Sequence, residues 1–188
     1  MTDTTYGPGA LLTPANLVTI ARIALAPVAF VMMWNDPNQS SWPLVAVWFV
    51  LSTSDMIDGR LARRHGATRS GAFLDPLADK VLVLGGVGIM CHLGRFWWGA
   101  WALIAAREVA VSLFRSSYVR RGLAVPASKL AKYKTFLQLG SVGWVTLPWT
   151  TNLHWLSVGT LWIGVAAGLW SGVAYFAAGG RAATSMAR

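Results

Sequence analysis

Residues 42–80 read WPLVAVWFVLSTSDMIDGRLARRHGATRSGAFLDPLADK, an apolar run followed by a basic stretch that two pairs of aspartates flank. The 188-residue chain has only seven acidic residues, and four of them lie here: Asp55, Asp58, Asp75 and Asp79. Long apolar runs predict helices, so these carboxylates lie where one predicted helix ends and the next begins. The stretch therefore decides the fold and also suggests where any chemistry takes place.

The composition extends this pattern to the whole chain. Hydrophobic residues make up 55% of it and charged residues 12%, whereas soluble domains carry about 25% charged residues. A membrane-spanning helix needs roughly 20 mostly apolar residues. Six segments fit that requirement: residues 16–34, 42–60, 75–93, 97–118, 132–149 and 153–176. With no repeat or Ser/Gly-rich linker, residues 1–188 are predicted to form one all-α, polytopic membrane domain with six transmembrane helices.

Basic residues predict the orientation of these helices. The formal net charge is +9, and the cations cluster after predicted segments two, four and six, whereas the alternate connections hold only Arg95. Under the positive-inside rule the basic side faces the cytoplasm, and six crossings then place both termini there. We expect a multi-pass protein of the cell's inner (plasma) membrane. Beside a bilayer, the basic surface favours anionic lipids and phosphorylated substrates over nucleic acid.

The spacing of the aspartates predicts a metal site. Asp55 and Asp58 are three residues apart and Asp75 and Asp79 are four apart, so each pair shares one helical face. Antiparallel helices would bring the pairs together near the cytoplasmic edge. An all-oxygen cluster suits a hard divalent ion, Mg²⁺ or Mn²⁺, and two ions would suit phosphoryl chemistry. The alternative is a salt-bridge network between arginines and aspartates that only fixes helix packing.

The same residues resemble the signature of a known family, the CDP-alcohol phosphotransferases. Eight positions match in order over 25 residues: Asp55, Asp58, Gly59, Ala62, Arg63, Gly71, Asp75 and Asp79. The resemblance implies a six-helix membrane enzyme, usually a homodimer, with a cytoplasm-facing site and two divalent metals. Such enzymes transfer a phosphatidyl or similar group from a CDP-linked donor to an alcohol and release CMP.

The resemblance also implies a role for each matched residue. The four aspartates would ligate the metals, and Asp79 would also be the general base that deprotonates the acceptor hydroxyl. The CDP group would be bound by Asp55, Asp58, Gly59, Ala62, Arg63 and Gly71. Arg63 suits this role because its planar guanidinium can pair with phosphate oxygens through two hydrogen bonds.

The second half of the chain bears on the acceptor alcohol. The stretches AREVAVSLFR (residues 106–115) and AKYKTFLQ (131–138) resemble the bacterial phosphatidylglycerophosphate synthases, which use CDP-diacylglycerol as donor and glycerol 3-phosphate as acceptor. The phosphate of that acceptor would be bound by Arg107, Arg115, Lys132 and Lys134. Glu108 is expected to hold Arg107 in orientation.

Other functions stay open on the sequence alone. Inositol phosphate is also anionic, and phosphatidylglycerol serves relatives that have the same signature, so either could replace glycerol 3-phosphate as acceptor. A cation transporter is a further alternative, although transport sites tend to lie near the bilayer midplane rather than at its edge. A non-catalytic membrane scaffold would tolerate Asp79→Asn.

Overall fold

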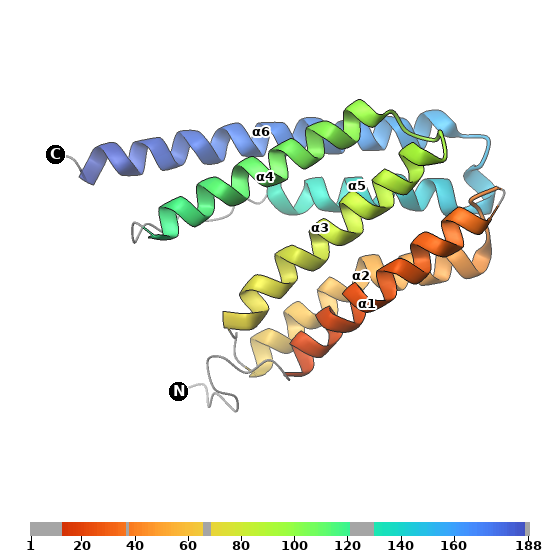
Figure 1. The fold of residues 1–188 in the computed structure, drawn as a ribbon, viewed down its shortest axis with the longest axis horizontal. Coiled ribbons are helices and arrows are strands. Elements are labelled where there is room, and N and C mark those ends of the chain that lie inside the picture. Colours follow the sequence, from red (N-terminus) through yellow and green to blue (C-terminus); the bar gives the residue numbers. More distant parts are fainter. Residues whose placement is uncertain (1–12, 37, 66–68, 121–129, 187–188) are drawn as a thin grey trace.

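A computed structural model describes residues 13–36, 38–65, 69–120 and 130–186, with side chains at 13–14, 16–36, 38–54, 74–116 and 133–177. These residues contain no β-strand, and six α-helices follow one another along the chain (Figure 1). Their bounds are α1 Pro14–Asn35, α2 Trp42–His65, α3 Arg69–His92, α4 Trp98–Arg120, α5 Leu130–Thr146 and α6 His154–Met186. A short 3₁₀ helix, Pro148–Thr150, precedes α6. The predicted all-α fold and its six helices are confirmed.

Local chemistry fixes where individual helices begin and end. Thr13 is the N-cap of α1, and its hydroxyl accepts a 3.2 Å hydrogen bond from the Asn16 amide. Pro14 follows at the first helical position, where its missing N–H leaves no bond unmade. At the far end of α3, Gly94 has a φ of 74°, a left-handed conformation that glycine adopts without strain. The chain turns there toward α4.

Helix α3 is central in the bundle. It packs against α1 and α2 on one side and against α4 and α5 on the other, while α6 packs on α4 and α5. The helices converge where residues 36–41, 93–97 and 147–153 connect them, which we call the narrow end (Figure 1). They diverge toward the wide end, where α1, α3 and α5 begin and α2, α4 and α6 end (Figure 1).

The narrow end contains a tightly packed apolar core, with fully buried Met33, Leu44, Leu82 and Met90. Glycines of α3 let aromatic rings from its neighbours approach its backbone. A Cβ built on Gly86 would lie 2.6 Å from Cη2 of Trp48, and one on Gly85 only 2.3 Å from Cζ of Phe30. The Trp48 indole N–H also donates to the Leu139 carbonyl at 3.1 Å, which joins α2 to α5. This end of the bundle therefore depends on close steric fit.

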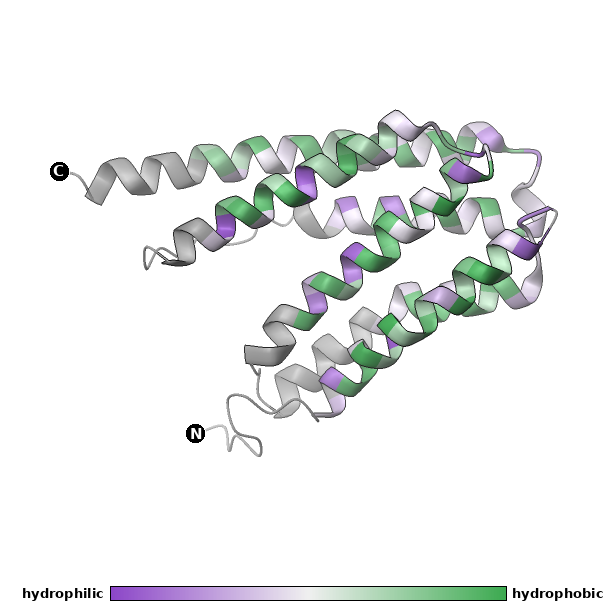
Figure 2. Ribbon diagram, in the orientation of Figure 1, coloured by the Kyte–Doolittle hydropathy of each residue, from purple (hydrophilic) through white to green (hydrophobic). Residues whose placement is uncertain are grey.

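The outer surfaces are apolar over much of the bundle. Within the described residues, two helices are long and apolar enough to cross a membrane, Asn16–Asn35 and His154–Ala177, and Trp42–Ser54 is a shorter apolar segment. In α3, α4 and α5, hydrophilic residues interrupt the apolar surface toward the wide end (Figure 2). These residues lower the mean hydropathy of α3 and α4, which have 24 and 23 residues, whereas α5 has only 17 residues.

The helix bounds differ from the predicted segments mainly at the wide end. Helix α2 continues to His65 and α3 begins at Arg69, whereas the segments were expected to end at residue 60 and to begin at residue 75. Charged residues ended the apolar pattern in the sequence, but residues 61–65 of α2, LARRH, include Leu, Ala and Arg, which have good helix propensity and continue that helix. Asp75 and Asp79 consequently lie well inside α3 rather than at its start.

Candidate functional site

A cavity of about 210 Å³ lies between α3, α4, α5 and α6. Six charged side chains line it: Asp79, Lys80, Arg107, Glu108, Arg115 and Lys134. Four cations thus accompany two carboxylates, a formal excess of two positive charges. The cavity lies in the part of the bundle that is nearer the wide end, because α3 and α5 begin there. A cavity with excess positive charge between largely apolar helices favours a small anionic ligand.

The structure brings together most of the residues predicted to serve the acceptor. Arg107, Arg115 and Lys134 all line the cavity, and the predicted base, Asp79, lies on its wall. The side chain of Lys132 lies outside the described residues. Phosphate binding by these residues stays a prediction.

Glu108 holds two of these cations. The Arg107 guanidinium donates through Nη1 to Glu108 Oε1 at 2.8 Å, and the Lys134 ammonium donates to the same oxygen. Arg107 also donates through Nη2 to Ser171 Oγ at 2.8 Å and through Nε to the Gly168 carbonyl at 3.1 Å. The predicted Arg107–Glu108 pairing is confirmed, whereas sequence reasoning missed that Lys134 shares the carboxylate. The three groups connect α4 to α5 and α6.

These three side chains are largely removed from solvent. Their exposed fractions are 10% for Arg107, 15% for Glu108 and 8% for Lys134. A buried charge needs a partner and hydrogen bonds to offset its lost hydration. One carboxylate between two cations leaves a net positive charge in the cavity, which an anion can neutralise. The arrangement is therefore suited to bind a phosphate.

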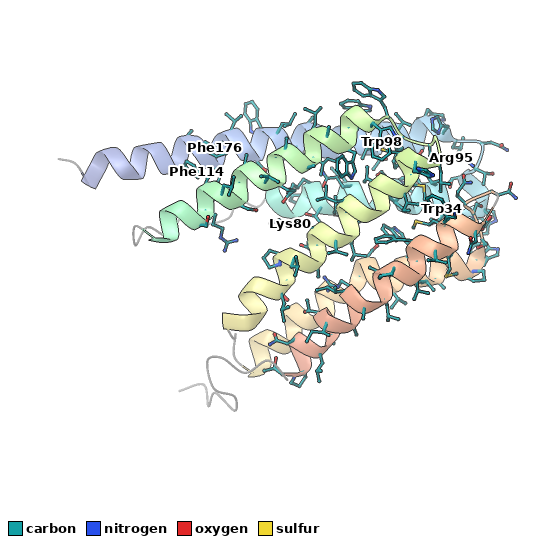
Figure 3. All side chains as sticks on the ribbon, in the orientation of Figure 1. Trp34, Lys80, Arg95, Trp98, Phe114 and Phe176 are labelled. Carbon is teal, nitrogen blue, oxygen red and sulfur yellow. The ribbon has the colours of Figure 1, made fainter. Side chains whose placement is uncertain are left out.

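Lys80 is a cation of the cavity that sequence reasoning did not assign to substrate. It follows Asp79 in α3, and its ammonium donates to Ser112 Oγ at 2.6 Å (Figure 3). Ser112 in turn donates to the Glu108 carbonyl at 2.6 Å, so it fixes Lys80 against α4. Its position next to the predicted base was visible in the sequence, but its orientation toward α4 was not.

On the other side of α3, helix α1 contacts both aspartates. The Thr19 hydroxyl donates to Asp75 Oδ1 at 3.0 Å, and Arg22 Nη1 lies 3.5 Å from Asp79 Oδ1. Arg22 Nε also donates to Ser54 Oγ of α2 at 2.9 Å. Arg22 thus joins Asp79 to the turn of α2 that immediately precedes position 55.

The predicted metal and nucleotide site draws on both α2 and α3. The side chains of Asp55, Asp58, Gly59, Ala62, Arg63 and Gly71 lie outside the described residues, although the backbone of these positions belongs to α2 and α3. Among the side chains that are described, no group of three or more His, Cys, Asp or Glu residues could hold a metal ion. Half of the predicted set, Asp75 and Asp79, lies one turn apart on α3.

The donor chemistry of Asp75 and Asp79 fits a hard divalent ion. Both supply carboxylate oxygens, and the described residues of the cavity that Asp79 lines include no His or Cys, the residues that softer metals prefer. Each carboxylate is also contacted by a hydrogen-bond donor from α1 that can fix its orientation. Such outer partners are typical of metal-ligating carboxylates.

The chain is similar to known proteins over most of its length. A sequence profile of the CDP-alcohol phosphatidyltransferase family matches residues 12–170. A "Probable phosphatidylglycerophosphate synthase" of Mycobacterium tuberculosis (strain H37Rv) is 35% identical over 167 residues, which cover 87% of this chain and 79% of that protein. The "CDP-diacylglycerol–glycerol-3-phosphate 3-phosphatidyltransferase" of Escherichia coli (strain K12) is 31% identical over 170 residues, which cover 87% of this chain and 92% of that protein.

Proposed function

This chain belongs to the CDP-alcohol phosphatidyltransferase family, and on that premise we propose that it transfers a phosphatidyl group from CDP-diacylglycerol to glycerol 3-phosphate. The products are phosphatidylglycerophosphate and CMP. One observation carries the choice of acceptor: Asp79 lies on the wall of a cavity that four cations line. The relatives whose names specify glycerol 3-phosphate support the same acceptor.

The cavity supplies the acceptor site. Its volume of about 210 Å³ is below the roughly 300–1,000 Å³ of sites that take drug-sized ligands, so it suits a small phosphorylated alcohol. Arg115 and Lys80 bind the phosphate together with Arg107 and Lys134, which Glu108 holds in place. Lys132 of α5 completes the proposed set. Charge-assisted hydrogen bonds to phosphate are the strong kind, and arginine forms them in pairs.

The proposed reaction is a direct displacement at phosphorus. Asp79 accepts the proton of the acceptor hydroxyl, and the oxygen attacks the β-phosphorus of CDP-diacylglycerol. A new P–O bond forms to glycerol 3-phosphate as the bond from that phosphorus to the bridging oxygen breaks, and CMP leaves with the bonding electrons. Because aspartate is a weak base, with a reference pKa of about 3.9, the position of Asp79 beside the hydroxyl matters more than its basicity.

Asp55, Asp58, Asp75 and Asp79 are proposed to hold two divalent ions, Mg²⁺ or Mn²⁺. When bound, these ions offset the charge on the pyrophosphate oxygens. The pairing of Asp75 and Asp79 on one face of α3 supports this assignment. The cytidine nucleotide is proposed to bind along Gly59, Ala62, Arg63 and Gly71, where small residues let the ligand approach the backbone.

The same proposal includes the membrane setting. We place the single domain in the inner (plasma) membrane with six crossings, both termini and the site on the cytoplasmic side, and the active unit as a homodimer. The apolar surfaces of α1 and α6 support membrane insertion. Nucleic acid is not a partner in this account. The basic residues in the last turns of α2 and α4 and the first turns of α3 and α5 support the orientation, because these helix ends lie at the wide end.

Release of CMP by the purified protein tests the function. With CDP-diacylglycerol and Mg²⁺, the acceptors to compare are glycerol 3-phosphate, inositol 1-phosphate, phosphatidylglycerol and serine. Turnover only with glycerol 3-phosphate is expected. Turnover only with another acceptor would be consistent with the proposed metal site but would refute glycerol 3-phosphate as the acceptor. A protein that moves cations and releases no CMP with any acceptor would instead support the transporter.

A further inference from the structure

Thr19 and Arg22 are polar residues that are buried within the apolar helix α1. Thr19 and Arg22 are three residues apart and so share one face of the helix. Their exposed fractions are 0% and 2%, although the segment around them, Asn16–Asn35, is long and apolar enough to cross a membrane. Burying an arginine is unfavourable unless its charge and donors find partners. The groups that hydrogen-bond or pair with these two side chains therefore indicate what the side chains do.

The partners of both residues include aspartates on which the proposed chemistry depends. Thr19 donates to Asp75 Oδ1 at 3.0 Å, and Arg22 lies 3.5 Å from Asp79 Oδ1. Arg22 reaches α2 with the same guanidinium, through the 2.9 Å hydrogen bond from Nε to Ser54. Ser54 is itself held by its hydrogen bond to the Leu51 carbonyl at 2.9 Å. A single face of α1 thus connects the two aspartates of α3 with the turn of α2 before position 55.

We propose that Thr19 and Arg22 are positioning residues for the metal-ligating carboxylates. Thr19 fixes the rotamer of Asp75, and Arg22 fixes Asp79 relative to α2. The inference rests on the metal site of the proposed function and adds two residues of α1 to it. These residues act through the aspartates and do not contact substrate. Removal of such an outer partner typically lowers metal affinity or activity 10- to 100-fold.

The alternative is that the two side chains only pack α1 against α2 and α3. Thr19→Val separates these roles, because valine has nearly the same shape as threonine but cannot donate to Asp75. Thr19→Ser keeps the donor and removes a methyl group. If the hydrogen bond matters, serine preserves metal binding, and if packing matters, valine preserves it.

The structure offers a matched control. Thr146 of α5 is 1% exposed, and its hydroxyl donates to the Gly143 carbonyl of its own helix at 2.9 Å. Thr146→Val therefore removes a buried hydroxyl of the same kind at the narrow end, where no predicted metal ligand lies. Any general effect of such a replacement on the bundle will appear in this variant as well.

Binding of Mn²⁺ to the purified full-length protein, followed by the electron paramagnetic resonance of free Mn²⁺ without lipid substrate, is the test. Thr19→Val is expected to raise the dissociation constant about tenfold, with Thr19→Ser and Thr146→Val within twofold of the wild type. Equal affinity in Thr19→Val, an equal loss in Thr146→Val, or no Mn²⁺ binding by the wild type would overturn the inference. Because no turnover is measured, a protein that shows the expected Mn²⁺ pattern but releases no CMP would refute the proposed function alone.

Arg22→Lys provides a second variant that keeps the charge. The guanidinium of Arg22 contacts Ser54 and Asp79 through different nitrogens. A lysine has a single ammonium nitrogen and cannot contact both residues in the same way. We expect kcat to fall about tenfold while KM for the acceptor stays within twofold, because Asp79 loses its orientation and the acceptor cavity is unchanged. A rise in KM with kcat unchanged would overturn the role of Arg22.

Discussion

The two ends of the bundle differ in what holds their helices together. At the narrow end, rings such as Trp48 and Phe30 fit over glycines of α3, and steric fit dominates. At the wide end, charged and polar groups such as Arg22, Glu108 and Lys134 connect the helices. The difference indicates that the two ends have separate roles. The apolar end stabilises the bundle, and the polar end positions the carboxylates and cations that take part in the proposed reaction. Substitutions at one end should therefore change activity, and those at the other should change stability.

Asp79→Asn should show the largest effect. The amide matches the carboxylate in shape but cannot accept the hydroxyl proton, so we expect CMP release to fall by at least about 100-fold. The protein is expected still to fold, because the amide oxygen can accept from Arg22 in place of the carboxylate. Asp36→Asn is the matched control, because Asp36 lies at the narrow end and accepts a 2.9 Å hydrogen bond from the Asn38 amide. Full activity in Asp79→Asn would remove Asp79 as the base.

Arg115→Gln should have a smaller effect that is confined to the acceptor. Arg115 lines the cavity and is exposed, so its replacement leaves no buried charge unpaired. Loss of a charge-assisted hydrogen bond of about 1.5–3 kcal/mol predicts a rise in KM for glycerol 3-phosphate of roughly 10- to 100-fold, with KM for CDP-diacylglycerol unchanged. Steady-state kinetics with each substrate varied in turn measure this.

Arg95→Gln is the corresponding change at the narrow end. Arg95 donates to Gln39 Oε1 at 2.6 Å and to the Asn38 carbonyl at 3.1 Å, so it joins the α1–α2 and α3–α4 connections (Figure 3). We expect lower stability and an unchanged KM for both substrates. If Arg95→Gln raised the acceptor KM as much as Arg115→Gln, the two ends would not be functionally separate.

Gly86→Ala should change stability and leave the chemistry intact. The added Cβ would meet Trp48 at 2.6 Å, and overpacking of this kind lowers the free energy of unfolding by about 1–3 kcal/mol. Gly140→Ala is its control, because a Cβ there meets nothing within 4 Å and an alanine in a helix stabilises it by up to about 1 kcal/mol. Thermal unfolding in detergent should move in opposite directions for the two variants, and movement in the same direction would count against close packing at Gly86.

The sequence was sufficient to predict the helices and the spacing of the aspartates, but not the contacts between side chains on different helices. The apolar runs located six helices, and the i, i+4 spacing placed Asp75 and Asp79 on one face of α3. The contacts of Thr19 with Asp75 and of Lys134 with Glu108 join residues 56 and 26 positions apart. Local periodicity carries no information on such pairings, since they depend on how the helices cross. The pairing of Arg107 with Glu108 was predictable because the two residues are neighbours in the chain.

Identification of the lipid product tests the central claim most directly. Vesicles that contain CDP-diacylglycerol, the purified protein, Mg²⁺ and glycerol 3-phosphate are analysed by mass spectrometry, and CMP is measured in the same samples. The account predicts that phosphatidylglycerophosphate and CMP accumulate in equal amounts and that neither forms with Asp79→Asn or without a divalent ion. CMP release without this lipid, or the lipid formed equally well by Asp79→Asn, would contradict it.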